Sequence, residues 1–289
     1  MLAQTGTYTG NLTDNRAITG IGFEPSLVII KGDTSERAVF KTASMSGDTS
    51  FQFATGSLAA NFIQSLDSDG FTIGTSAKVN SNSITYYYVA IRRETNDPDF
   101  NYGTYTGDGT DDRNITGVGF QPTLVIIKGD TSSDIGNFFD NNDDDSTGSH
   151  LIGGSPVPNT IQALQSDGFQ IGSAAGINSS GVVFYWFAFR SVTRRIITGS
   201  YTGNATDDRN ITGLGFQPDW VFLQRYGLDR DVVFRTNSFS GDTSLTFDDP
   251  VAIETNRIQA LQSDGFQIGT NSDVNASDRT YHWFALVNT

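Results

Sequence analysis

The sequence predicts an all-β protein built from three tandem homologous β-sandwich repeats, each about 97 residues long. An eight-residue polar phrase occurs three times: TDNRAITG at 13–20, TDDRNITG at 110–117 and TDDRNITG at 206–213. A second segment also recurs: IQSLDSDGFTIG at 63–74, IQALQSDGFQIG at 161–172 and the same letters at 258–269. The composition favours short strands and tight turns, because 31 glycines accompany a charged fraction of only 17%.

The repeats keep a period of 96–98 residues along the chain. Residues 103–122 and 199–218 are identical at 16 of 20 positions, and residues 6–25 match 199–218 at 14 of 20. Solenoid repeats are shorter, at roughly 20–50 residues, whereas a small β-sandwich has this size. We therefore expect three domains, at 1–97, 98–194 and 195–289.

Each repeat contains about seven strand-like segments. In the first repeat they are GTYTG at 6–10, LVIIKG at 27–32, AVFKT at 38–42, SFQF at 50–53, NFIQSL at 61–66, FTIG at 71–74 and TYYYVAI at 85–91. The Asp-Gly pair of DSDG predicts a hairpin turn between two of them, because glycine accepts positive φ. A proline precedes the LVII-type strand in every copy, where a missing N–H does no harm: Pro25, Pro122 and Pro218.

Two strands of each repeat are apolar on both faces. A strand with one wet face alternates apolar and polar residues, and neither LVII nor FYWFAF does so. One face of the closing strand carries Tyr88, Trp186 and Trp283. The other face carries Val89, Phe187 and Phe284. We expect neighbouring repeats to cover the second face, with the three units packed around a pseudo-threefold axis.

The overall composition argues against several classes of partner. A net charge of −14 repels phosphate backbones, so no nucleic-acid partner is expected. The chain has no cysteine, which excludes disulfides, thiolate nucleophiles and Cys-ligated metals. No apolar run reaches 18 residues, and the opening MLAQTGTYTG lacks the charged and apolar parts of a secretion signal. No membrane partner is expected, and release from a cell would use another route, such as lysis.

The repeated phrase holds the first candidate site residues: Arg16, Arg113 and Arg209. Each arginine lies two residues after an aspartate: Asp14, Asp111 and Asp207. A carboxylate–guanidinium clamp within the loop would fix the turn, and we favour this structural interpretation. The alternative is three equivalent binding points for a sugar or a partner surface.

An acidic segment distinguishes the second repeat. DNNDDDSTG at 140–148 replaces TASMSGDTS at 42–50 and TNSFSGDTS at 236–244. The alternating oxygen donors Asp140, Asn142 and Asp144 resemble the start of a calcium loop. Asp145 and Leu151 stand where such a loop needs Gly and Glu, so the pattern favours a solvated acidic loop and no cofactor. Calcium is the alternative.

Signals for catalysis are weak throughout the chain. His282 occupies an aromatic strand position, and His150 has no Gly-x-Ser-x-Gly or other nucleophile signal near it. Two histidines are too few for a zinc centre. A pair of carboxylates could still hydrolyse glycosides, and only the 140–145 region is specialised enough to supply one. We expect no enzymatic activity.

A family resemblance adds to this interpretation. GFQPTLVIIKG, GFEPSLVIIKG, GFQPDWVFLQ and closing strands such as YYYVAIR resemble β-sandwich modules of bacteriophage virion proteins, of the tail-fibre, baseplate-associated and capsid-decoration types. The third copy departs from the pattern, because Gln224 replaces Lys31 and Lys128. The resemblance implies a structural or adhesive task at the virion surface, and it implies no catalytic residue.

Three functional hypotheses follow. The leading one is a non-enzymatic phage virion structural protein, a capsid decoration or a tail or fibre component, whose partners are other virion proteins or copies of itself. The second is a lectin-like adhesin that binds host cell-surface glycans through exposed aromatic rings. The third is a glycan-cleaving enzyme.

Overall fold

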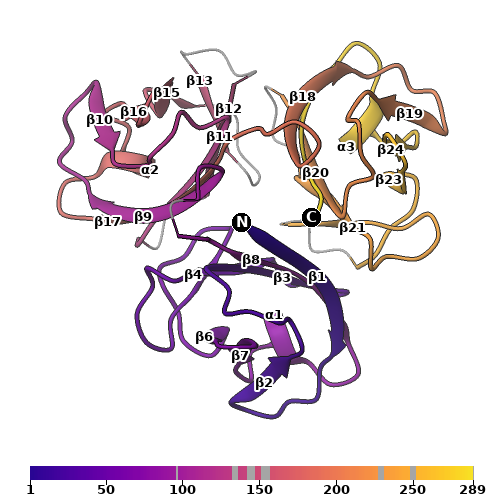
Figure 1. The fold of residues 1–289 in the computed structure, drawn as a ribbon, viewed down its shortest axis with the longest axis horizontal. Helices are drawn as coiled ribbons and strands as arrows, with labels where there is room; N and C mark the ends of the chain where they lie inside the picture. Colours follow the sequence, from indigo (N-terminus) through magenta and orange to yellow (C-terminus); the bar gives the residue numbers. More distant parts are fainter. Residues whose placement is uncertain are drawn as a thin grey trace.

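The computed structural model describes residues 1–95, 97–131, 136–141, 147–150, 157–226, 231–247 and 252–288, with 147–150 described for the backbone alone. Three copies of one two-sheet unit surround a common centre (Figure 1). The predicted all-β architecture of three sandwich repeats is confirmed.

The first repeat shows the plan of all three. Its large sheet has the order β1 (Leu2–Thr9), β8 (Thr85–Arg92), β3 (Leu27–Gly32), β4 (Val39–Thr42) and β5 (Phe51–Gln52). Its small sheet has the order β2 (Arg16–Thr19), β7 (Gly70–Ile73) and β6 (Ile63–Asp67). The single-turn helix α1 (Ala77–Asn80) packs against β3. All pairings are antiparallel, as expected for a chain that returns through short turns.

The second and third repeats have the same layers. The large sheet of the second repeat is β14 (Val157–Pro158), β13 (Thr147–His150), β12 (Asn137–Asp140), β11 (Leu124–Gly129), β17 (Val183–Phe189) and β9 (Phe100–Thr106), and its other elements are β10 (Arg113–Thr116), β16 (Gly168–Ile171), β15 (Ile161–Gln165) and α2 (Ala175–Asn178). The large sheet of the third repeat is β18 (Ile196–Thr202), β25 (Thr280–Leu286), β20 (Trp220–Arg225), β21 (Val233–Thr236) and β22 (Leu245–Thr246), and its other elements are β19 (Arg209–Thr212), β24 (Gly265–Ile268), β23 (Ile258–Gln262) and α3 (Ser272–Asn275).

The interpretation of the repeated phrase as a loop is wrong for its second half. Its first half is a turn that places one residue at positive φ: Asn15 (53°), Asp112 (56°) and Asp208 (54°). Asn and Asp tolerate this region better than other side chains. The next four residues form an edge strand of the small sheet, β2, β10 or β19, because the isoleucine at its centre is buried.

The predicted Asp-Gly hairpin turn is present between β6 and β7. Gly70 has φ +149°, and a Cβ atom on it would lie 2.0 Å from the carbonyl oxygen of Ile18. Glycine is therefore required at position 70 for two reasons: the turn needs its positive φ, and β2 approaches too closely for a side chain.

One face of each large sheet packs against the small sheet of its own repeat. Each interior contains an aromatic pair in edge-to-face contact between closing strand and hairpin: Phe71–Tyr88 at 5.4 Å, Phe169–Trp186 at 5.8 Å and Phe266–Trp283 at 5.7 Å. These rings belong to three separate clusters of buried residues, one per repeat.

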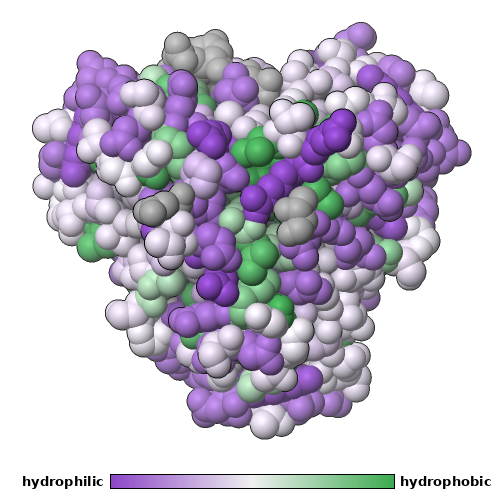
Figure 2. Space-filling model, viewed as in Figure 1, coloured by the Kyte–Doolittle hydropathy of each residue, from purple (hydrophilic) through white to green (hydrophobic). Residues whose placement is uncertain are grey.

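The other face of each large sheet lies at the centre of the molecule. Val89, Phe187 and Phe284 all belong to one cluster of buried residues drawn from the three repeats. Its aromatic rings meet across the repeat boundaries: Phe40–Phe187 at 5.6 Å, Phe138–Phe222 at 5.8 Å and Phe53–Phe247 at 4.8 Å. Figure 2 shows hydrophobic residues gathered where the lobes meet and polar residues over the lobes. The expected two-faced burial around a pseudo-threefold axis is confirmed.

Polar contacts repeat around the same axis. Asp33 Oδ1 accepts from the N–H of Ile253 at 2.7 Å, and Asp130 Oδ1 accepts from the N–H of Leu58 at 2.8 Å. Both contacts cross a repeat boundary at equivalent positions. Thr5 and Thr198 likewise donate to Asn237 (2.5 Å) and Asn141 (2.8 Å) of the neighbouring repeats.

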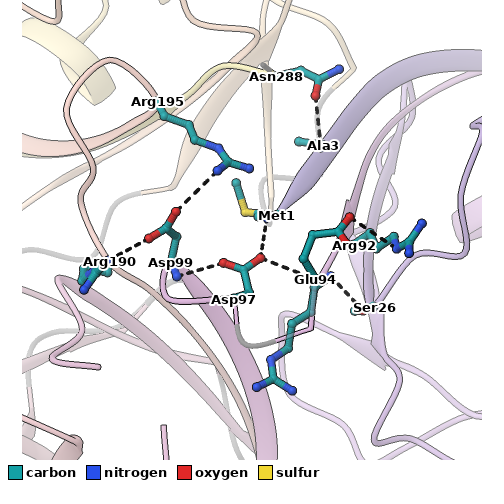
Figure 3. A network of polar contacts seen from close by, with 11 residues as sticks. Met1, Ala3, Ser26, Arg92, Glu94, Asp97, Asp99, Arg190, Arg195 and Asn288 are labelled. Carbon is teal, nitrogen blue, oxygen red and sulfur yellow. Dashed lines mark hydrogen bonds and ion pairs between the residues drawn. The ribbon is translucent and has the colours of Figure 1, made fainter. Parts of the chain in front are cut away.

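The two connections between repeats meet beside the chain's first residue (Figure 3). The amino group of Met1 lies 2.5 Å from the buried carboxylate of Asp97. Asp99, also buried, pairs with Arg190 at 3.1 Å and with Arg195 at 3.4 Å. This network joins the connection that follows the first repeat to the one that follows the second.

Replacing Phe222 by Ala tests the shared core. Phe222 is 1% exposed and contacts rings of the second and third repeats within the shared cluster, so its truncation leaves a cavity at the centre. We expect a loss of about 3–5 kcal/mol in the free energy of unfolding, measured by urea denaturation. Leu12→Ala, at a side chain 57% exposed, is the control and should change it by less than about 0.5 kcal/mol. Equal effects of the two variants would contradict the central core.

Candidate functional site

A buried asparagine organises the repeated phrase in every copy: Asn80, Asn178 and Asn275, at the ends of α1, α2 and α3. In the first repeat, Asn80 Nδ2 donates to the carbonyls of Thr13 (2.7 Å) and Gly74 (3.0 Å). Its Oδ1 accepts from the N–H of Asn11 at 2.9 Å. The same bonds recur in the other repeats within 0.1 Å. One side chain thus fixes both ends of the turn.

The three candidate arginines stabilise the same turn, but with different partners from those expected. Arg16 Nη1 donates to the carbonyl of Thr9 at 2.6 Å, and the guanidinium carbon lies 5.4 Å from the centre of the Tyr8 ring. Arg113 and Arg209 make the equivalent contacts, to Thr106 at 2.7 Å and to Thr202 at 2.6 Å.

The prediction that each arginine pairs with the aspartate two residues earlier is therefore wrong. The carboxylate within 3.4 Å of Arg113 is that of Asp108, not Asp111. The edge strand begins at the arginine, and the side chain of Arg113 reaches the carbonyl of Thr106, the last residue of β9. The preceding aspartates instead accept from a glutamine of the small sheet: Gln64 to Asp14 (3.1 Å), Gln162 to Asp111 (3.0 Å) and Gln259 to Asp207 (3.1 Å).

A further aspartate caps the glycine-rich turn that follows the phrase. Asp69 accepts from the N–H groups of Gly20 (3.0 Å) and Gly22 (2.7 Å). The equivalent residues Asp167 and Asp264 make the same pair of bonds, at 2.6–3.1 Å. Hydrogen bonds from these backbone N–H groups lower the pKa of Asp69 and of Asp264 below the usual 3.8.

The phrase therefore forms a polar surface whose side chains are held by hydrogen bonds within the repeat. Its arginines, its first aspartates and the buried asparagine are all bonded within the repeat. The chemistry that such a surface offers is shape and hydrogen-bonding groups in a fixed arrangement, presented once on each lobe.

The candidate calcium residues are only partly described. Asp140 is fully buried at the end of β12, and its Oδ1 lies 3.3 Å from Nδ1 of His282 in the neighbouring repeat. Asn142 and Asp144 lie outside the described residues. Within the described ranges, no group of three or more His, Cys, Asp or Glu side chains could hold a metal ion.

The two histidines have different surroundings. His282 is 4% exposed and stacks on Tyr226 at 4.8 Å, at the boundary between the second and third repeats. At the equivalent position, Tyr87 stacks on Phe239 of the third repeat and Tyr185 contacts Phe51 of the first. His282 therefore occupies an aromatic position of its strand, as predicted. His150 pairs through its backbone with Asn137.

No protein-family model matches the chain, and no curated protein is significantly similar to it. Among the described residues, no helix has the length and apolar character needed to cross a bilayer.

The change Asn178→Asp tests the buried asparagine. It places a carboxylate oxygen against the carbonyls of Thr110 and Gly172, where Nδ2 now donates at 2.7 and 2.9 Å. We expect a loss of at least about 2 kcal/mol in the free energy of unfolding, from urea titration at neutral pH. Asn114→Asp, at an exposed site in the same phrase, is the matched control and should be nearly neutral.

The capping aspartates predict acid sensitivity. Because the folded-state pKa values of Asp69 and Asp264 are depressed, their stabilisation is complete above about pH 4 and lost as the pH falls through those values. The double variant Asp69→Asn, Asp264→Asn should unfold more easily than the wild type at about pH 7, and the difference should shrink towards about pH 2.5. Urea titrations across this range measure it, with the exposed Asp112→Asn as control. A difference independent of pH would contradict the cap.

Proposed function

We propose that the chain is a non-enzymatic bacteriophage virion structural protein, a capsid decoration or a tail or fibre component, that acts through protein packing and surface display. The observation that carries this proposal is the single buried core shared by the three repeats. Three domains joined in this way form one body whose outer surface presents the same structured phrase three times.

The internal bonding of these phrases supports a display role. A loop whose side chains are already bonded to its own repeat loses little conformational freedom when a partner binds. Pre-organised surfaces of this kind suit lasting contacts within a particle. The virion setting is supported by the resemblance of GFQPTLVIIKG and its sister segments to phage modules.

The adhesin hypothesis is the second candidate, and one observation favours it. The first and third repeats each contain a polar pocket at the same place in the fold, of about 480 and 500 Å³. Both volumes lie in the range of small-molecule sites.

Localisation in the particle tests the virion proposal. Mass spectrometry of purified particles of the encoding phage should find the chain in constant ratio to the major virion proteins. Cryo-electron microscopy should show a three-lobed density that is missing from particles of a deletion mutant. Confinement of the chain to the soluble fraction of infected cells, with none in purified particles, would refute the proposal.

A further inference from the structure

Two equivalent pockets lie where the segment after β4 or β21 meets the small sheet. Aligned positions recur in their walls, among them Lys41 and Arg235, Asp48 and Asp242, and Gln64 and Gln259. The recurrence in two repeats means that the fold itself generates the pocket, although some of its side chains differ between the copies.

A buried cation shapes one wall of each pocket. Lys41 is 3% exposed, and its Nζ donates to the carbonyls of Gly47 (2.8 Å) and Thr49 (2.5 Å). Arg235 is 5% exposed and donates to the carbonyl of Gly241 at 2.8 Å and to that of Thr243. Burial lowers the pKa of Lys41 to about 8. The cations hold their loops in place and disfavour a positively charged ligand.

An incompletely bonded glutamine forms another part of each wall. Gln259 is 8% exposed, and its Nε2 donates to Asp207 while its Oε1 is buried without a hydrogen-bond partner. Gln64 repeats this arrangement, with Nε2 bonded to Asp14 and Oε1 unpartnered. Arg235 Nε is likewise buried without a partner. Unpaired buried polar atoms are costly in a folded protein. These atoms have almost no accessible surface, so a ligand bonds them only when the side chain turns toward the pocket, and that bond removes the cost.

The unpaired atoms and the charges together define the ligand chemistry. Gln64 Oε1 and Gln259 Oε1 need donors, whereas Arg235 Nε–H needs an acceptor. A hydroxyl group donates to the glutamine oxygen and accepts from Arg235 Nε–H, and a second hydroxyl of the same ligand donates to the carboxylate of Asp48 or Asp242. Phosphate or carboxylate groups would be repelled by those carboxylates. The pockets thus suit a neutral ligand rich in hydroxyl groups.

Apolar side chains complete both pockets. Met45 lines the first and Phe239 the third at the same aligned position, each beside a leucine of the small sheet. Met45 is 4% exposed and Phe239, which stacks on Tyr87, is 6% exposed, so each offers the pocket an apolar edge. Such an edge suits the C–H groups of a sugar ring, which are apolar between its hydroxyl groups.

We infer that the first and third repeats each bind a neutral saccharide in this pocket, with Gln64 and Gln259 accepting a sugar hydroxyl. This inference does not depend on the virion assignment, because the pockets are complete within the chain. The second repeat carries the same glutamine, Gln162, with Oε1 also unpartnered. Residues 142–146, which follow β12 there, lie outside the described part of the chain.

Glycan binding by the intact protein tests the inference. An array of neutral bacterial surface oligosaccharides, with sialylated and phosphorylated counterparts, identifies a ligand, and titration calorimetry then measures affinity and stoichiometry. We expect binding to a neutral oligosaccharide with at least two equivalents per chain. Gln64→Leu and Gln259→Leu should each weaken one site by about tenfold or more, and the double variant should lose two equivalents.

Two further sets of variants separate binding from folding. Gln165→Leu removes a half-buried glutamine that bonds Asn114 at 2.9 Å and lines neither pocket, so binding should be unchanged. Ala43→Trp and Ala260→Trp fill the pockets without removing a buried hydrogen bond, and they should abolish binding even where a glutamine variant fails to fold. Absence of neutral saccharide binding by the wild type would overturn the inference. Equal loss in Gln165→Leu, or unchanged binding in the tryptophan variants, would also overturn it.

Discussion

Burial of both faces of the large sheet is the constraint on which the rest of this structure depends. A sandwich satisfies one face of each sheet and leaves the other for solvent. Here the other face carries side chains such as Phe187 and Phe284, which are at most 1% exposed only because neighbouring repeats cover them. The three large sheets therefore stabilise one another. The three repeats of the sequence are arranged around a pseudo-threefold axis. The small sheets and the repeated phrases are left on the outside of each lobe.

Duplication has preserved contacts within repeats more strictly than contacts between them. The buried asparagine, the arginine and the capping aspartate keep their partners in all three copies. Between repeats, several of the contacting residues differ: a tyrosine stacks on Phe239 at one boundary, whereas His282 meets Asp140 at another. The contacts within a repeat are needed for each lobe to fold, because no neighbouring group replaces a hydrogen bond that is lost from a turn. At a packed boundary several side chains can fill the same volume.

The architecture could be predicted from the sequence, but the side-chain contacts of the loops could not. Strand periodicity, repeat length and the unbroken apolar runs predicted the sandwich repeats and the central core, since these depend on hydrophobic pattern alone. The role of Asn80 was missed, although Asn recurs at the end of AKVN, AGIN and SDVN in the three copies. The partner of Arg16 was also missed, because a guanidinium can reach many oxygens and only the strand direction selects the carbonyl of Thr9. Pairing of the phrase with β7 depends on a strand fifty residues away, which local turn chemistry cannot reveal.

The unlike boundaries also determine how this body meets a symmetric neighbour. Tyr87 with Phe239, Tyr185 with Phe51 and His282 with Asp140 make the three junctions chemically distinct, although the lobes share one fold. Rotation by one third of a turn about the axis therefore superposes similar lobes but brings different residues to each junction. On an exactly threefold neighbour the molecule would have three orientations of equal energy. Whichever orientation it took, the three otherwise identical subunits of that neighbour would each face a different lobe and so become distinct.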